Sequence, residues 1–147
     1  MNAIELARQC ADRMLAHDEA TRALGIEIAI PAPGHAIARV EVTAAMINGF
    51  GVCHGGYLFT LADTAFAFAC NAYGRVTMAA GASIDFLRPV QAGDRLEASA
   101  RELHRGRSQG IYDVIVRDQN GRTVALFRGR AQATERPLPG DPESAQK

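Results

Sequence analysis

The chain has 147 residues, of which 48% are hydrophobic, so it is long enough to fold as one domain with a substantial core. Sixteen basic residues balance sixteen acidic ones, which leaves no whole-molecule field to attract nucleic acid or an anionic membrane. We therefore expect neither nucleic acid nor a membrane as a partner, and any anion binding must be local.

The cysteines argue against a disulfide framework and against a structural metal site. They are odd in number, show no Cys-x-x-Cys spacing and lie far apart, at Cys10, Cys53 and Cys70. The first 15 residues carry charges throughout, unlike a signal peptide, and no stretch reaches the ~20 apolar residues of a membrane-spanning helix. These patterns predict a soluble protein of the reducing cytoplasm that holds no metal.

The N-terminal part predicts an amphipathic helix followed by a β-hairpin. Residues 3–17 place apolar side chains at helical spacing, namely Ile4, Ala7, Cys10, Ala11, Met14 and Leu15. After Gly25, residues 26–30 alternate as a strand, residues 31–34 favour a turn, and alternation resumes over residues 36–42.

A second helix is predicted from Gly55 to about Asn71, with Gly74 as a stop signal beyond its end. This segment is apolar around most of its circumference, which is typical of a helix in the middle of a domain. Asp63 is the exception. An unpaired carboxylate costs roughly several kcal/mol to remove from water, so Asp63 must be hydrogen-bonded, protonated or exposed in a cleft where its charge is used.

The rest of the chain predicts antiparallel strands, over residues 76–90, 95–103, 110–117 and 123–133. The dipeptide Asn120-Gly121 favours a type I′ turn between the last two. One long helix with several antiparallel strands indicates an α+β domain whose sheet wraps the helix. We expect this single domain to span residues 1–134, followed by a flexible tail, 135–147, and we expect its edge strands to be covered by a second copy.

The tripeptide His54-Gly55-Gly56 stands at the start of the second helix. A helix N-terminus offers free N–H groups and about half a positive charge, and glycine lets a ligand carbonyl approach closely. Such a site suits an oxyanion. The alternative is that the two glycines only permit a tight turn into the helix, and that Asp63 is a solvated acid beside Thr60 and Thr64.

The spacing between Gly55 and Asp63 has a geometric consequence. Eight residues at 1.5 Å each separate them by roughly 12 Å along one helix. Acyl transfer needs the oxyanion donor and the base or nucleophile within about 3 to 4 Å of the reacting centre. If both groups act together, Asp63 must therefore meet Gly55 of a second chain, in two equivalent sites related by a twofold axis.

The stretch from Asn48 to Ala67, with its Asn, His-Gly-Gly and Asp spacing, and the later residues 84–89 resemble the hotdog-fold acyl-CoA thioesterases. The resemblance is greatest to the phenylacetate-degradation, PaaI-type branch, and it extends from about residue 24 to 132. It implies a hotdog fold, in which an antiparallel sheet wraps one long central helix. It also implies assembly into dimers, and we expect dimers to pair further into a dimer of dimers.

The resemblance implies a role for each residue of the motif. Asp63 matches the carboxylate that attacks the thioester or activates water, Gly55 the N–H that polarises the carbonyl, and Asn48 the side chain that holds the carboxylate or water. For His54 a structural role in fixing the loop is favoured over proton transfer. Related branches carry a hydroxyl where this chain has Ala67, which leaves open how the nucleophile is positioned.

The expected reaction is hydrolysis of an aryl-acyl-CoA, such as phenylacetyl-CoA or its hydroxylated form, to free acid and coenzyme A. Coenzyme A belongs to the substrate, and no separate cofactor is expected. Candidates for contact with the substrate are arginines for the phosphates and residues near the helix start for the acyl group. They are Arg88, Arg105 and Arg107, and Phe50, Gly56, Tyr57 and Thr64.

Two other functions stay open. One is a non-catalytic module that binds acyl-CoA, although such a module has no need of a buried acid. The other is a hydratase or dehydratase of the same fold, which would depend on a histidine such as His54. A nucleophilic pair of Cys53 and His54 is disfavoured, because adjacent side chains seldom converge.

Overall fold

The computed structural model describes residues 1–139, and statements about the structure refer to this part of the chain. The elements in chain order are α1 (Ala3–His17), α2 (Glu19–Ala23), β1 (Glu27–Ala32), β2 (His35–Glu41), the short 3₁₀ helix η1 (Ala44–Met46), α3 (Gly55–Cys70), β3 (Arg75–Phe86), β4 (Arg95–Arg105), β5 (Gln109–Arg117) and β6 (Thr123–Pro137).

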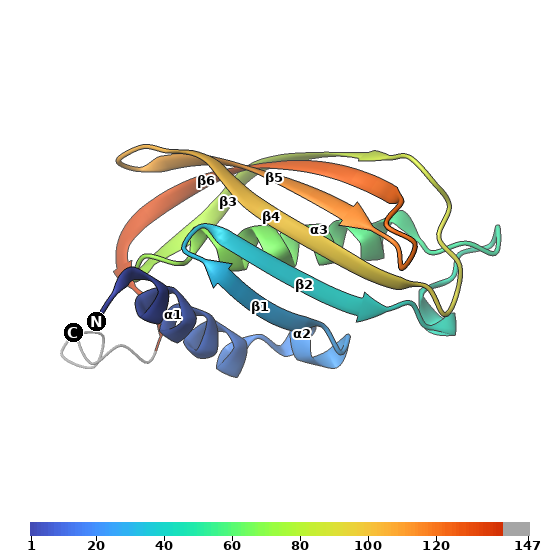
Figure 1. Cartoon of the computed structure of the whole chain (residues 1–147), viewed down its shortest axis with the longest axis horizontal. Helices are drawn as coiled ribbons and strands as arrows, with labels where there is room; N and C mark the ends of the chain where they lie inside the picture. Colours follow the sequence, from blue (N-terminus) through green and yellow to red (C-terminus); the bar gives the residue numbers. More distant parts are fainter. Residues whose placement is uncertain (140–147) are drawn as a thin grey trace.

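All six strands form one antiparallel sheet in the order β1-β2-β4-β5-β6-β3, and this sheet curls around α3 (Figure 1). The predicted α+β hotdog architecture is confirmed. Strand β3 does not pair with β4, which follows it in the sequence. It crosses to the far edge, where β6 is its one partner, and so it ends the sheet as a 12-residue edge strand.

Helix α3 packs against two kinds of strand surface. On β2 and β4 the inward positions are alanines without exposed surface, which allows a close approach; they are Ala36, Ala38, Ala98 and Ala100. On β5 and β6 the inward side chains are larger, and the ring of Phe66 lies 5.5 Å from that of Tyr112 and 5.8 Å from that of Phe127. Gly129 makes room for the same ring, since a Cβ there would lie 2.8 Å from Phe66.

Helix α1 has the bounds that the sequence predicts, and it packs beside β1. A capping box starts it: the Asn2 side chain accepts from the Glu5 N–H, and the Glu5 carboxylate accepts from the Asn2 N–H. Its apolar stripe buries Ala7, Cys10 and Ala11. Because α1 lies along the β1 side of the sheet (Figure 1), β3 is the edge without a helical cover in the described chain.

The turn between β5 and β6 is not the predicted type I′ turn. That turn needs a positive φ at both central residues, whereas here Gly121 has φ 75° and Asn120 does not have a positive φ. The Gly121 N–H donates to the Asp118 carbonyl, and the Asp118 N–H donates to the Arg122 carbonyl, both at 3.0 Å. This is a three-residue loop with a bulge, and the Asp118 carboxylate stabilises it by accepting from the N–H groups of Asn120 and Arg122.

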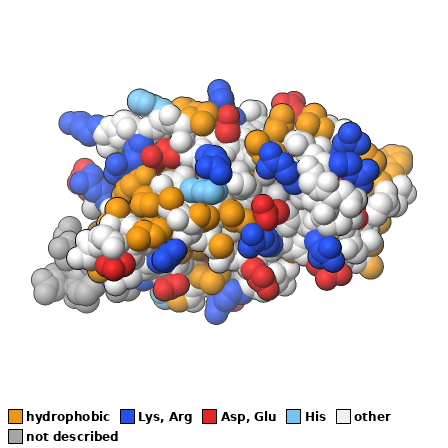
Figure 2. All heavy atoms as spheres, in the orientation of Figure 1, with side chains coloured by type: hydrophobic (Ala, Val, Ile, Leu, Met, Phe, Trp, Pro, Cys, Tyr) orange, Lys and Arg blue, Asp and Glu red, His pale blue; other side chains and the backbone are white. Residues whose placement is uncertain are grey.

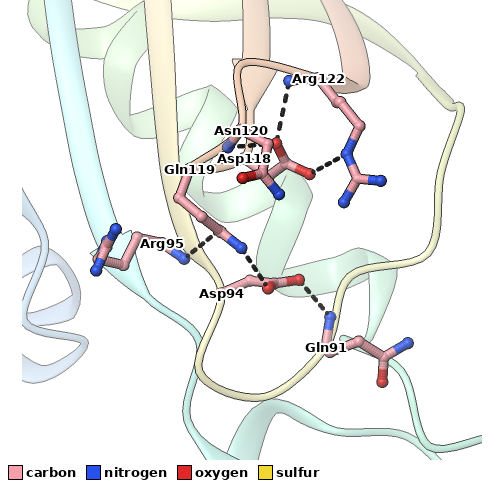
Figure 3. A network of polar contacts seen from close by, with 7 residues as sticks. All are labelled: Gln91, Asp94, Arg95, Asp118, Gln119, Asn120 and Arg122. Carbon is pink, nitrogen blue, oxygen red and sulfur yellow. Dashed lines mark hydrogen bonds and ion pairs between the residues drawn. The ribbon is translucent and has the colours of Figure 1, made fainter.

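Figure 3 shows how this turn is tied to the loop before β4. The Gln119 side chain donates to the Asp94 carboxylate and accepts from the Arg95 N–H, both at 3.0 Å. The segment before β4 in turn holds the start of α3, because the Cys53 N–H donates to the Val90 carbonyl at 2.7 Å. The hairpin turn therefore supports the chain that leads into α3.

Strand β6 continues through the expected domain boundary at residue 134. Its last residue, Pro137, pairs with Arg75, and the following Leu138 is buried. The rest of the predicted tail, residues 140–147, lies outside the described residues. Strand β3 ends at Phe86, four residues before the expected end of its apolar run.

The outer face of the sheet carries arginines and acids interspersed with apolar side chains, as Figure 2 shows over β1, β2 and β4. Arg39 on β2 pairs with Glu97 on β4 at 3.0 Å, for example, with both side chains about half exposed. In the described chain, no helix combines the length and the apolar character needed to cross a membrane.

Candidate active site

Asp63 lies in the middle of α3, on a stripe that the sheet leaves partly uncovered. Its side chain makes no hydrogen bond or ion pair within residues 1–139, and burial raises the pKa of its carboxyl above the ordinary value. Thr60 and Thr64 do not cap it, because their hydroxyls donate to the carbonyls of Gly56 and Thr60 at 2.9 and 2.6 Å. The carboxylate is thus a stronger base than a solvated one and is available to a ligand or a second chain.

Gly55 is the first residue of α3, and its N–H has no hydrogen-bond acceptor in the described chain. The neighbouring Gly56 N–H is engaged, because it donates to Nδ1 of His54 at 2.8 Å. The ring of Phe86 packs against Gly55 so closely that a Cβ on Gly55 would lie 3.0 Å from it. At the helix N-terminus, the Gly55 N–H is therefore a free donor in a partly covered position.

His54 is the N-cap of α3. Since its Nδ1 accepts from the Gly56 N–H, the neutral ring carries its proton on Nε2. The tautomer makes His54 a donor rather than a base at its exposed nitrogen, which disfavours the hydratase hypothesis. The Cys53 thiol is buried, and burial raises its pKa, so a nucleophilic Cys53 is disfavoured as well.

Asn48 shapes the loop that precedes α3. Its side-chain oxygen accepts from the N–H groups of Phe50 and Val52 at 2.9 and 3.3 Å, and its own N–H donates to the Val52 carbonyl at 2.8 Å. The amide NH₂ of the same side chain has no acceptor in residues 1–139. Asn48 therefore has two donors left for a carboxylate, a water or a ligand.

The structure does not bring Gly55 and Asp63 together within one chain. Both lie on the straight helix α3, separated by roughly 12 Å along its axis. Two groups that each lack a partner in the described part of the chain are thus fixed at a distance that one small reacting group cannot span.

The apolar candidates for substrate contact lie on the surface of the single chain. Phe50 is 93% exposed at the tip of the loop that Asn48 organises, and Tyr57 is 37% exposed. Beside Tyr57 is a small apolar cavity lined by residues of α3, β2, β4 and the neighbouring loops, including Leu61, Val42 and Leu96. Tyr57 therefore stands between solvent and the interior.

The three candidate arginines fall into two groups. Arg88 borders an open cavity of about 470 Å³ with Gly55 and Phe86, at the N-terminal end of α3. Arg105 and Arg107 border a different cavity, of about 340 Å³, at the C-terminal end of the helix. They cannot all contact one phosphate of a ligand bound to a single chain.

Comparison with known proteins identifies the family. Residues 50–125 match the model of the thioesterase superfamily. The chain is also 49% identical over 125 residues to the acyl-coenzyme A thioesterase PaaI of Escherichia coli (strain K12). The aligned residues cover 85% of this chain and 89% of that protein. The chain belongs to the thioesterase superfamily.

Solved structures agree with this assignment. The E. coli PaaI protein from the phenylacetic acid degradation operon superposes with a TM-score of 0.90 at 45% identity, covering 92% of this chain and 99% of that one. A hypothetical thioesterase from Streptococcus pneumoniae TIGR4, solved with coenzyme A, superposes with a TM-score of 0.72 at 28% identity, covering 76% of this chain and 90% of that one. In this thioesterase, Gly55 and Asp63 both fall inside the segment that the family model matches.

Sequence reasoning missed one polar cluster near the C-terminal end of α3. The hydroxyls of Tyr73 and Tyr112 both donate to one carboxylate oxygen of Glu102, at 2.8 and 2.7 Å. A signal was present, because Glu102 takes the inward position that follows Leu96, Ala98 and Ala100 along β4. Within residues 1–139, no group of three His, Cys, Asp or Glu side chains is arranged to hold a metal ion.

Proposed function

We propose that this thioesterase hydrolyses acyl-CoA thioesters, with aryl-acyl groups such as phenylacetyl or hydroxyphenylacetyl as its substrate class. The name of the E. coli relative, an acyl-coenzyme A thioesterase, supports the coenzyme A part of this proposal. The phenylacetic acid degradation operon of its solved structure supports the aryl part. The reaction draws on coenzyme A as a part of the substrate and on no further cofactor.

One observation carries the proposal: α3 holds a carboxylate and an N–H donor, about 12 Å apart, and neither has a partner among residues 1–139. Two such helices running antiparallel about a twofold axis put Asp63 of each chain next to Gly55 of the other. Each of the two sites then has one oxyanion donor and one base or nucleophile. The active unit is therefore a homodimer.

Two surfaces of the chain fit a second copy. The free edge of β3 presents unpaired backbone groups along 12 residues, next to the exposed Met78, Phe86 and Leu87. The uncovered stripe of α3 is rich in small and aromatic residues, which suits close contact with another helix; it consists of Gly56, Phe59, Thr60, Asp63, Thr64 and Ala67. Pairing β3 with β3 of a second chain would cover both surfaces at once, and we expect such dimers to pair again into tetramers.

The chemistry follows from these positions. The Gly55 N–H and the positive end of the helix stabilise negative charge on the thioester oxygen as it develops. Asp63 of the partner chain either removes a proton from water, whose oxygen bonds to the carbonyl carbon, or attacks that carbon and forms an anhydride that water then cleaves. In both routes the carbon–sulfur bond breaks, and the coenzyme A thiolate takes up a proton.

Asn48 and His54 support the two reacting groups in this proposal. The free amide of Asn48 holds the water or the carboxylate, and His54 keeps the first turn of α3 in place through Gly56. Thr64 contributes its lone pairs only, since its proton is used within the helix. The odd number and unpaired spacing of the cysteines fit a cytoplasmic location, which we also propose.

A thiol-release assay tests the function. Phenylacetyl-CoA, hydroxyphenylacetyl-CoA and straight-chain acyl-CoAs are supplied to the protein and to Asp63→Asn, and free coenzyme A is measured. We expect hydrolysis of the aryl substrates, with a loss of at least about 100-fold in the variant. Equal turnover by Asp63→Asn and the parent protein would show that the Asp63 carboxylate takes no part in the reaction. No turnover of any thioester would refute the function.

A further inference from the structure

The backbone groups of β3 point alternately toward β6 and toward the free edge of the sheet. Leu87, just after the end of β3, donates its N–H to the Val124 carbonyl at 2.9 Å. Because neighbouring residues of an antiparallel strand turn their backbone groups to opposite sides, Ser83 and Asp85 also face β6. The residues between and beside them turn their N–H and C=O groups to the free edge; they are Ala82, Ile84 and Phe86.

A bulge at Ala80 limits the regular part of this edge. The register between β3 and β6 shifts between Ala79 and Gly81. The Ala80 carbonyl accepts a hydrogen bond from Nη2 of Arg130, on β6, at 3.2 Å. Since a bulge bends its strand and disrupts the ladder, the regular free edge is short and runs from Gly81 to Phe86.

The proposed dimer fixes the height at which its twofold axis crosses β3. If Asp63 of each chain meets Gly55 of the other, the axis is level with the residue midway between them, Phe59, which is about 6 Å along α3 from Gly55. Strand β3 runs back along α3 and ends beside its start (Figure 1), where the Phe86 ring lies against Gly55. At about 3.3 Å per residue, the same height on β3 is about two residues before Phe86, at Ile84.

The two faces of the sheet restrict the centre of the pairing further. In the proposed dimer both α3 helices lie on one side of the joined sheet, so inward side chains of one β3 must stand opposite inward side chains of the other. Since side chains alternate between the faces, the axis must pass through a residue and not between two residues. The centres to compare are Ser83, Ile84 and Asp85.

A centre at Ile84 uses all the regular backbone groups of the free edge. It sets Ile84 opposite its own copy and Ala82 opposite Phe86 of the partner subunit. All of these residues turn their N–H and C=O groups to the edge, so each pair can exchange two hydrogen bonds. The bulge at Ala80 lies outside the paired segment.

The two alternative centres each have a physical cost. A centre at Ser83 would pair Phe86 with Ala80 of the partner subunit, in the bulge, where the carbonyl is already bonded to Arg130. A centre at Asp85 would set the two Asp85 carboxylates directly opposite each other, and like charges in that position are destabilising.

Side-chain sizes fit the centre at Ile84. Phe86 and Leu87 are 53% and 51% exposed in the single chain, and this register sets them opposite Ala82 and Gly81 of the partner subunit. A large side chain opposite a small one can be covered without a clash. Because Ala82 shares the inner face with Phe86, it also becomes part of the wall beside Gly55 in the other chain's site.

We infer that β3 pairs with β3 of a second copy in a register centred on Ile84, which places Ser83 opposite Asp85 of the partner subunit. The inference rests on the proposed function, because the height of the axis follows from the contact between Asp63 and Gly55. It adds to that function the residues that meet across the twofold axis.

Disulfide cross-linking of Ser83→Cys and Asp85→Cys tests the register. Directly opposite Cα atoms in a pair without backbone hydrogen bonds are about 4.5 Å apart, which a disulfide spans, whereas diagonal neighbours at about 7–8 Å are too far. We expect the co-refolded mixture of the two variants to give a covalent dimer on mild oxidation, and neither variant alone to do so. The parent protein is the control, because its cysteines are buried.

Every other cross-linking pattern decides against the inference. A covalent dimer of Ser83→Cys alone would place the centre at Ser83, and one of Asp85→Cys alone would place it at Asp85. No covalent dimer in the mixture would also overturn the inference.

Hydrolysis of phenylacetyl-CoA shows whether this register is that of the active dimer. Cross-linked Ser83→Cys/Asp85→Cys should have a kcat/KM within about twofold of the value for the same protein after reduction. A cross-linked dimer that becomes active only on reduction would contradict the register. Failure of the thioesterase function is distinguishable, because no thioester is then hydrolysed in either state, while the cross-linking pattern still reports the register.

Discussion

His54 accepts a hydrogen bond of 2.8 Å from the N–H of Gly56, through its Nδ1 atom. This bond caps α3 through the N–H of Gly56. The neighbouring N–H of Gly55 has no acceptor in the described chain. A side chain that looks like a general base in the sequence is thus placed as part of the helix start.

This relationship predicts different effects for two substitutions of His54. His54→Ala removes the cap and should destabilise the protein by about 1 kcal/mol while lowering thioester hydrolysis. His54→Asn keeps a side-chain acceptor and should recover most of the stability and most of the activity. Chemical denaturation and kcat measurements on the two variants check this, and an inactive but stable His54→Asn would instead indicate proton transfer by the imidazole.

The ionised carboxylate of Asp63 should lower the free energy of unfolding of the protein. Because burial raises its pKa, the folded protein holds the Asp63 proton to a higher pH than the unfolded chain does. The destabilisation is absent below the unfolded pKa, grows as pH rises through the window up to the folded pKa, and is complete above it. Asp63→Asn should therefore melt at a higher temperature than the parent protein at neutral pH, with the difference disappearing in acid.

Melting curves of both proteins between pH 3 and pH 8 measure this difference, and Asp63→Glu serves as a charge-retaining control. We expect the melting temperature of Asp63→Asn to rise while its thioester hydrolysis falls, because a group that is needed for activity often lowers stability. An Asp63→Asn protein that is less stable at neutral pH would mean that donors at the dimer interface, such as the Asn48 amide, stabilise the carboxylate more than burial destabilises it.

The close approach of Phe66 to Gly129 predicts a large effect of a single methyl group. A Cβ at position 129 would lie 2.8 Å from the buried ring, which is confined by Tyr112 and Phe127. Gly129→Ala should destabilise the fold by about 1–3 kcal/mol. Gly49→Ala is the control, since no atom of the described residues lies within 4 Å of a Cβ there, and urea unfolding should show almost no change for it. Equal stability of the two variants would contradict the packing.

Much of α3 could be predicted from the sequence because its signals are local. The predicted start at Gly55 is the observed one, and the predicted end near Asn71 is within one residue of the observed end. The turn at Asn120-Gly121 was predicted wrongly, because the dipeptide rule ignores the carboxylate of Asp118, which favours a different turn.

The remaining features depend on pairings between distant segments. The place of β3 beside β6 rather than β4 follows from the closure of the sheet around α3, which no local pattern encodes. The contact of Glu102 with Tyr73 and Tyr112 needs the pairing of β4 with β5, with its irregularity after Glu102. For the candidate site, the eight-residue spacing in the sequence was enough to predict that Gly55 and Asp63 lie apart on one helix. The capping role of His54 could be seen only in the structure.

In the proposed dimer, each active site takes Asp63 from one chain and Gly55 from the other. Mixed dimers of two inactive variants test this arrangement. Asp63→Asn supplies one lesion, and Gly55→Pro supplies the other by removing the N–H, with the Phe86 side chain shifting to admit the proline Cβ. Proline suits the first position of a helix, and His54 before it already has the extended backbone (φ −59°, ψ 132°) that a following proline requires.

In a mixed dimer, one site carries both lesions and the other carries none. Random mixing of equal amounts should therefore restore roughly a quarter of the parent activity, since half of the dimers are mixed and each has one intact site. Each variant alone should remain inactive. Thiol release from phenylacetyl-CoA after co-refolding the two variants is the measurement; recovery near this level supports the shared site, and no recovery from a population shown to contain mixed dimers would contradict it.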